Sequence, residues 1–225
     1  MTEGRRGAGQ TETGRLEAFS DGVFAVAITL LALNLAVPRL ADGRPAPHLV
    51  AALAGQWPVY LAYALSFLTI LIMWVNHHAL FVFIRRADHL FLLLNGLLLL
   101  VITAIPFATA LLAAYLREPD PDKKAAQTVY SSLSLAMALV YNRMWAYASR
   151  DGRLLDPAAD GRLVESITKQ FRVGPGLYLL TVLLAFVSAE ASLALCILLA
   201  VFFALPSTLT RPLAELLGRG GRPPR

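Results

Sequence analysis

Long apolar segments constrain the fold of this chain more than any other feature. The stretch from Gly22 to Leu33 carries no charge, and Thr29 is its only polar side chain. A helix that crosses a bilayer needs about 20 mostly apolar residues. The whole sequence is 57% hydrophobic and 16% charged, whereas a soluble domain is about half apolar and a quarter charged. The sequence therefore predicts an all-α integral membrane protein.

Six segments have the length and apolar character of transmembrane helices, and we expect them at 16–37, 49–80, 89–116, 125–149, 173–189 and 191–209. Most of the 20 Lys and Arg residues fall on the side of the N-terminus in this arrangement. Cytoplasmic loops carry the excess of basic residues, so both termini are expected in the cytoplasm. We expect a flexible tail at 1–14, the transmembrane domain at 15–210 and a second tail at 211–225.

Several function classes are disfavoured by these features. The net charge of +5 comes from basic residues in the loops between spans, which is typical of membrane orientation rather than of nucleic-acid binding. The first 14 residues lack the apolar core of a signal peptide. The single cysteine, Cys196, excludes a disulfide within the chain. We expect the lipid bilayer of the cell membrane as a partner, and no cofactor.

Polar residues stand at the start of the first apolar segment. Its opening carries Arg15, Phe19, Ser20 and Asp21 directly before the uncharged stretch. A carboxylate at the end of a membrane helix is costly unless it has a partner or water, and such residues often mark functional sites. The alternative is a carboxylate favoured by the positive end of the helix dipole.

One face of the first segment forms an apolar stripe. At 100° per residue, Val26, Thr29, Leu30 and Leu33 fall on the same face as Phe19. Such a stripe is either a helix–helix interface or the wall of a narrow apolar pore, and periodicity alone favours the interface. Asp21 points away from this face, toward neighbouring helices.

A second group of polar residues lies near the inner end of the second segment and comprises Trp74, Asn76, His77 and His78. The predicted topology puts it on the same membrane side as Asp21. We therefore expect a network that joins it to Arg15, Ser20 and Asp21 and holds the first helix. Solvated imidazoles at the interface are the alternative for the histidines. A metal or proton-sensing site is a weaker alternative for the histidines, because a metal needs three or four converging ligands.

The motif Arg15-x-x-x-Phe19-Ser20-Asp21 resembles the signature that opens the first helix of the transmembrane protein 175 family, a family of potassium-selective channels. The segment Trp74-Val-Asn-His77-His78 resembles its Trp/His cluster, and Asn95 with Pro106-Phe107 resembles its third helix. The resemblance implies a bacterial single-repeat member that forms a homotetramer, with four copies of the first helix lining the pore.

The resemblance also implies roles for individual residues. Val26, Leu30 and Leu33 match the positions of a hydrophobic constriction, and Thr29 matches a hydroxyl related to selectivity. Val26 departs from the Ile or Leu that the family more often has there. The family lacks the Thr-Val-Gly-Tyr-Gly filter of ordinary potassium channels, and this chain lacks it too. The resemblance therefore implies that K+ passes through the hydrophobic constriction instead.

Two other function classes remain open at this point. A secondary or proton-coupled transporter would fit a multi-pass protein, although such proteins usually show internal repeats and broken helices. An intramembrane enzyme could use the His/Asp cluster, but the sequence has neither His-Glu-x-x-His nor Gly-x-Ser-x-Gly. We therefore expect a channel rather than an enzyme.

Overall fold

The computed structural model describes residues 3–39 and 48–204, and all of its regular elements are helices. The helices are α1 (Glu3–Leu31), η1 (Ala32–Asn34), α2 (Leu49–Gly55), α3 (Trp57–Phe83), α4 (His89–Tyr115), α5 (Asp120–Ser149), η2 (Arg150–Gly152), α6 (Gly161–Val187) and α7 (Ala189–Ala204). The predicted all-α fold class is confirmed. Helix α1 already begins within the segment expected to be a tail, and the expected second tail lies outside the described residues.

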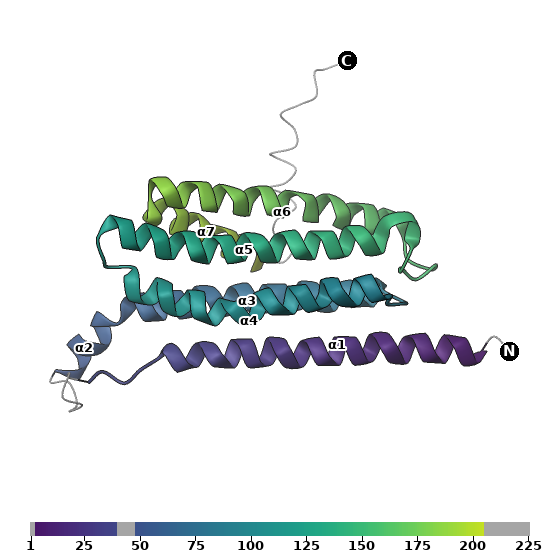
Figure 1. Cartoon of the computed structure of the whole chain (residues 1–225), viewed down its shortest axis with the longest axis horizontal. Helices are drawn as coiled ribbons and strands as arrows, with labels where there is room; N and C mark the ends of the chain where they lie inside the picture. The colour runs from purple at the N-terminus through teal and green to yellow at the C-terminus, as the bar shows by residue number, and fades with distance from the viewer. Residues whose placement is uncertain (1–2, 40–47, 205–225) are drawn as a thin grey trace, which may run out of the picture.

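The long helices lie roughly side by side in layers (Figure 1). The pair α3–α4 occupies the middle, with α5, α6 and α7 on one side of it and α1 on the other. Helix α1 packs mainly against α3 and α4. One side of α1 is therefore left without a helical neighbour in the described part of the chain.

The second predicted span, 49–80, is divided into two helices. Helix α2 ends at Gly55, and α3 begins at Trp57 with Pro58 in its first turn. Proline is well tolerated at the start of a helix because its missing N–H would have no intrahelical partner there. Gly55 and Pro58 together explain why the apolar run breaks here, although its hydrophobicity is continuous.

Helix α6 begins at Gly161 and continues without interruption through Pro175. An internal proline frees the carbonyl four residues earlier, which for Pro175 belongs to Phe171. The Asn142 side chain of α5 donates a hydrogen bond to that carbonyl at 2.7 Å. Because the freed carbonyl has a partner, the helix passes the proline without ending.

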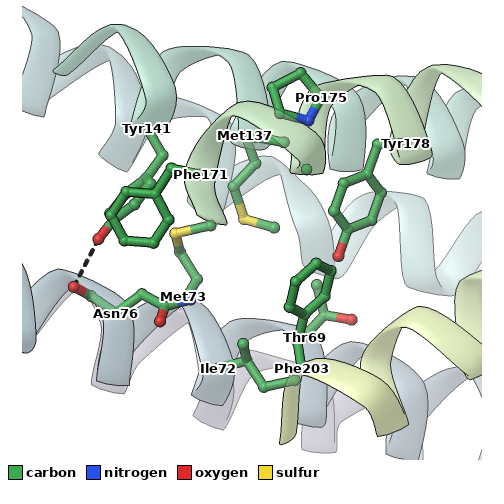
Figure 2. A pocket seen from close by; sticks show the side chains of 12 residues that line it. Thr69, Ile72, Met73, Asn76, Met137, Tyr141, Phe171, Pro175, Tyr178 and Phe203 are labelled. Carbon is green, nitrogen blue, oxygen red and sulfur yellow. Dashed lines mark hydrogen bonds between the residues drawn. The ribbon is translucent and has the colours of Figure 1, made fainter. Parts of the chain in front are cut away.

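Helix α5 is tied to α3 as well as to α6. The Tyr141 hydroxyl donates to the main-chain carbonyl of Asn76 at 2.7 Å (Figure 2). Phe171 of α6 packs edge-on against the Tyr141 ring, with centroids 5.0 Å apart. The middle layer and the α5–α6 layer are thus joined by both polar and aromatic contacts.

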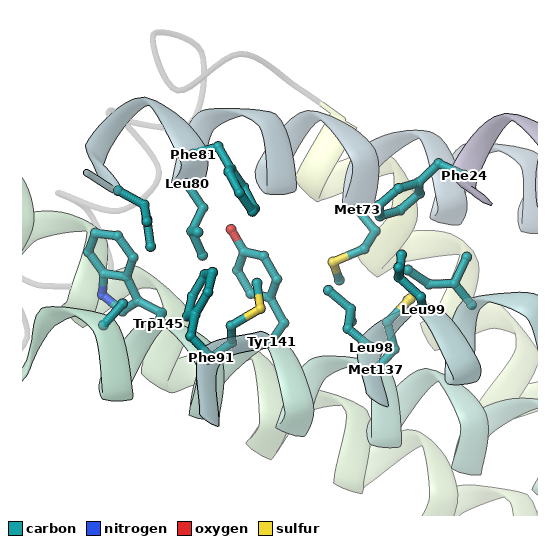
Figure 3. Packing of buried hydrophobic residues seen from close by; sticks show 14 of the residues in the cluster. Phe24, Met73, Leu80, Phe81, Phe91, Leu98, Leu99, Met137, Tyr141 and Trp145 are labelled. Atoms are coloured by element: carbon teal, nitrogen blue, oxygen red, sulfur yellow. The ribbon is translucent and has the colours of Figure 1, made fainter. Parts of the chain in front are cut away.

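The main core cluster runs between α1, α3, α4 and α5. Figure 3 shows Phe24 of α1 reaching toward Met73 of α3, beside Leu98 and Leu99 of α4. Phe24 and Leu98 are about fully buried, and burying such a side chain contributes roughly 1.5–3 kcal/mol. This packing fixes which face of α1 is turned inward.

The turn between α3 and α4 is fastened to the connection between α5 and α6. Ile84 and Leu155 form a β-bridge, and Arg85 pairs with Asp156 at 3.1 Å. Asp88 caps α4 by accepting the Phe91 N–H at 2.9 Å, as its position before an apolar run predicts.

Asp88 also accepts the Tyr147 hydroxyl at 2.5 Å and faces Arg153 at 3.6 Å. Burial works to raise the pKa of this carboxyl, but the hydrogen bonds from Tyr147 and Phe91 outweigh it, so the pKa lies below its ordinary value of 3.8. The folded state therefore favours the carboxylate. The stability that it adds is present above the unfolded pKa and is lost as the pH falls through the folded pKa.

Asp88→Ala is expected to lower the stability of the protein by about 2 kcal/mol, because a helix cap and a charged acceptor are lost together. In thermal unfolding in detergent at neutral pH, the midpoint should fall by roughly 4–8 °C. The deficit should shrink below about pH 4 as Asp88 becomes protonated. Glu118→Ala, at an exposed residue in the loop before α5, is the matched control. A midpoint equal to that control would contradict this role of Asp88.

Within the described residues, four helices are long and apolar enough to cross a membrane, namely Thr13–Asn34, Trp57–Phe83, His89–Tyr115 and Gly161–Val187. Helix α7 is apolar but shorter, at Ala189–Ala204. Helix α5 has 30 residues, but its first turns carry Asp and Lys and its centre carries several buried serines. The serines at the centre of α5 face the protein interior rather than lipid, since Ser131 and Ser134 are almost fully buried.

Candidate functional site

The stripe predicted on the first helix lies on the exposed side of α1 and continues into η1, which contains Leu33. Phe19 is 64% exposed, Val26 55%, Leu30 41% and Leu33 77%, and Thr29 is exposed among them. Large apolar side chains gathered in this way on one helix usually mark a surface that another molecule or lipid covers. The single chain therefore leaves this face available.

The opposite face of α1 is buried in the helix bundle. Ser20, Phe24, Ala27 and Leu31 recur at a spacing of three or four residues, and each has an exposed fraction of 1% or less. This spacing places them on one side of the helix. The inward face holds α1 in one orientation, so the outward direction of the stripe is determined by packing.

Thr29 presents oxygen lone pairs at the centre of the stripe. Its hydroxyl donates to the Val26 carbonyl at 2.9 Å within α1. A hydroxyl has one hydrogen and two acceptor lone pairs. The hydroxyl hydrogen of Thr29 is donated to the Val26 carbonyl. The lone pairs of the exposed hydroxyl oxygen can therefore face a passing cation.

A chain of hydrogen bonds crosses from α1 through α4 to α3. The Asn95 amide donates to the Ser20 hydroxyl at 3.0 Å, and its carbonyl oxygen lies 2.9 Å from His77 Nε2. Ser20 in turn donates to the Leu16 carbonyl at 2.8 Å. All three connected side chains are at most 1% exposed. Buried polar groups stabilise a packed interface when their hydrogen bonds are satisfied.

The Asn95 side chain is the centre of this chain of hydrogen bonds, yet it was absent from the predicted network. His77 is further enclosed by two aromatic rings, Phe24 at 5.2 Å and Phe81 at 4.7 Å between centroids. His77 therefore lies in the interior of the protein rather than in solvent. Its Nδ1 is buried and has no hydrogen-bond partner among the described residues.

Two further contacts connect α1 to α3 nearer the surface. Trp74 donates its indole N–H to Asp21 at 2.9 Å. His78 Nδ1 lies 2.9 Å from a carboxylate oxygen of Glu17, with its ring stacked on Trp74. Glu17 was not predicted as a partner, although it lies one helical turn before Asp21.

Two members of the predicted network lie outside it. Arg15 is exposed and makes no hydrogen bond or ion pair with another residue in 3–39 or 48–204. The Asn76 main chain accepts the Tyr141 hydroxyl, and its side chain faces a pocket on the other side of α3. The arrangement that forms therefore joins α1 to α3 and α4 through Glu17, Ser20, Asp21, Trp74, His77, His78 and Asn95.

Asp21→Ala is expected to impair folding, because the partly buried indole N–H of Trp74 loses its acceptor. An unsatisfied buried donor costs roughly 1–3 kcal/mol, and a partly buried one costs less. Asp21→Asn keeps an acceptor oxygen at the same place and is the matched comparison. The yield of monodisperse protein and its thermal midpoint should fall clearly for Asp21→Ala and less for Asp21→Asn. Equal behaviour of both variants and the native protein would contradict the anchoring role.

Comparison with known proteins connects this arrangement to a family. The family model described as endosomal/lysosomal potassium channel TMEM175 matches residues 15–106, which contain most of α1, all of α2 and α3, and most of α4. A protein of Chamaesiphon minutus named as a potassium channel is 50% identical over 198 residues, covering 88% of this chain and 96% of the relative. The chain belongs to the TMEM175 family. The resemblance seen in the sequence is confirmed.

A second relative and a solved structure agree with this assignment. A potassium channel of Streptomyces collinus is 49% identical over 192 residues, covering 85% of this chain and 91% of the relative. The crystal structure described as a lysosomal potassium-selective channel TMEM175 homolog from Chamaesiphon minutus superposes with a TM-score of 0.76 at 48% identity, covering 87% of this chain and 97% of that one. This TMEM175 family member is a multi-pass protein of a bacterial membrane.

Proposed function

We propose that this protein is a K+-selective channel, formed by four copies of the chain around a central pore that α1 lines. The observation that supports it best is the exposed stripe of α1. A helix whose inner face is tightly packed presents Val26, Leu30 and Leu33 outward, in a chain whose bacterial relatives are named potassium channels.

The proposed topology has six spans and both termini in the cytoplasm. Helices α1, α3, α4 and α6 supply four spans by length and apolar character. Helices α5 and α7 supply the other two, because α5 buries its polar face against its neighbours. Basic residues such as Arg85, Arg86 and Arg153 then lie on the inner side, as the charge rule for membrane proteins requires.

Conduction would follow from the chemistry of the stripe. Rings of aliphatic side chains can close a narrow pore by excluding water without filling it. A neighbouring ring of Thr29 hydroxyl oxygens can replace part of the hydration shell of a cation. K+ gives up its water more readily than Na+, so a step of partial dehydration favours K+. No cofactor takes part, and no chemical step is needed.

The experiment is a flux assay with the purified full chain in liposomes loaded with potassium chloride and placed in sodium chloride. A proton-sensitive dye with a protonophore reports charge-compensated K+ efflux. We expect protein-dependent efflux that is much larger than the flux under the reversed Na+ gradient. Uphill transport coupled to protons or Na+ would instead identify a secondary transporter, and equal K+ and Na+ flux would contradict selectivity.

A further inference from the structure

A pocket of about 90 Å³ lies between α3, α5, α6 and α7, away from the face of α1. Met73, Met137, Phe171, Pro175 and Phe203 supply much of its apolar wall (Figure 2). None of the residues that line it is charged. Its chemistry therefore excludes ions and favours an uncharged guest.

The pocket is placed in the middle of the bundle along α3. Its α3 residues run from Thr69 to Asn76, near the centre of a helix that extends over Trp57–Phe83. In the proposed topology this depth is surrounded by lipid hydrocarbon. A guest would therefore enter from the bilayer, where small uncharged amphiphiles accumulate.

Two polar groups of the pocket have no partner within the described residues. The Tyr178 hydroxyl and the Asn76 side-chain amide make no hydrogen bond there, whereas the Thr69 hydroxyl donates to Leu65 at 2.8 Å. Figure 2 shows Tyr178 and Asn76 at opposite sides of the pocket, with the Tyr178 hydroxyl directed toward Thr69 and Phe203. Both side chains are partly exposed and line the pocket, so each can offer a hydrogen bond to a guest.

The wall on the α6 side is shaped by its sequence. Gly174 has no side chain, and Pro175 leaves the Phe171 carbonyl to be held by Asn142. Between Phe171 and Tyr178, these two small residues leave room between α6 and α3. On the other sides the walls are adaptable, because Met73 and Met137 have flexible thioether side chains that adjust to different guests.

We propose that this pocket binds a small uncharged alcohol, a short-chain alkanol. Its hydroxyl group pairs with Tyr178, and its hydrocarbon part lies between Met73 and Met137. An apolar cavity of about 150 Å³ accepts benzene, so a pocket of 90 Å³ suits a guest smaller than benzene. This binding is independent of whether the protein conducts K+.

The test is photolabelling of the full chain in phosphatidylcholine liposomes with a butanol that carries a diazirine. Labelled peptides are identified by mass spectrometry, and we expect adducts concentrated on the pocket residues of α3, α5 and α6. Ala138→Leu fills the pocket from α5 and should abolish these adducts. Ala136→Leu, two residues away and outside the lining, is the matched control and should leave them unchanged.

Tyr178→Phe keeps the ring and removes only the hydroxyl, so labelling at low probe concentration should fall about fivefold, the effect of one hydrogen bond. This variant decides the matter if Ala138→Leu does not fold. Labelling spread evenly over the lipid-facing helices would overturn the proposal. Labelling that is unchanged in Tyr178→Phe would overturn it as well.

Discussion

Leu33→Ser is expected to raise K+ flux by about tenfold or more and to let Na+ pass as well. Leu33 lies in η1 at the end of the stripe and is 77% exposed. In the proposed tetramer, four serines in place of four leucines would turn a dry ring into a wetted one. A barrier lower by about 1.4 kcal/mol corresponds to a tenfold rate. The measurement is the liposome flux assay with K+ and Na+ gradients, at equal amounts of folded protein.

The control for this variant is Leu183→Ser. Leu183 is 55% exposed on α6, which lies on the far side of the bundle from α1 (Figure 1). Leu183→Ser should leave the K+ flux and the Na+ flux as they are in the native protein. If Leu33→Ser also leaves them unchanged, the stripe serves only as a contact surface between helices or with lipid.

Asn95→Ala is expected to cause the largest loss of stability among the substitutions considered. Its side chain bridges Ser20 and His77 in the interior. Its removal leaves the buried His77 ring without a hydrogen-bond partner among the described residues, takes one of two hydrogen bonds from Ser20 and opens a small void. The unpaired imidazole alone costs roughly 1–3 kcal/mol, and the lost hydrogen bond and the void add to it. The thermal midpoint in detergent should fall by roughly 10 °C, at 2–4 °C for each kcal/mol.

Leu97→Ala provides the comparison on the same helix. Leu97 is 44% exposed, so its truncation should shift the midpoint by a few degrees at most. Asn95→Asp keeps an acceptor for His77 but removes the donor to Ser20. Its thermal midpoint should lie between the midpoints of Asn95→Ala and Leu97→Ala. A midpoint for Asn95→Ala as high as that of Leu97→Ala would show that the bridge adds nothing.

Periodicity in the sequence predicted which residues of the first helix share a face, because Asp21 and the apolar stripe are separated by the helical repeat. The inward face, with Phe24 and Leu31, follows from the same spacing. The contact of Asp21 with Trp74 was also predictable, since both residues fall at the same end of antiparallel neighbouring spans. Local patterns that repeat along one helix thus carry directly into the fold.

Other contacts between distant segments were not predictable. Asn95 is a single amide within a leucine-rich run, and nothing near it in sequence indicates that Ser20 and His77 meet there. Pro175 suggests a helix break, but the carbonyl that it frees is bound by the distant Asn142. Such partners come from tertiary packing, which one helical pattern does not encode.

A pore lined by the first helix is tested most directly by thiol block of K+ flux at a cysteine in place of Leu33. In a Cys196→Ala background, Leu33→Cys would be treated with a charged methanethiosulfonate reagent during K+ efflux from liposomes, with Leu183→Cys as the control. The account predicts that efflux through Leu33→Cys falls steeply while efflux through Leu183→Cys is unchanged. Equal insensitivity of both, with labelling of each confirmed by mass, would contradict a pore lined by α1.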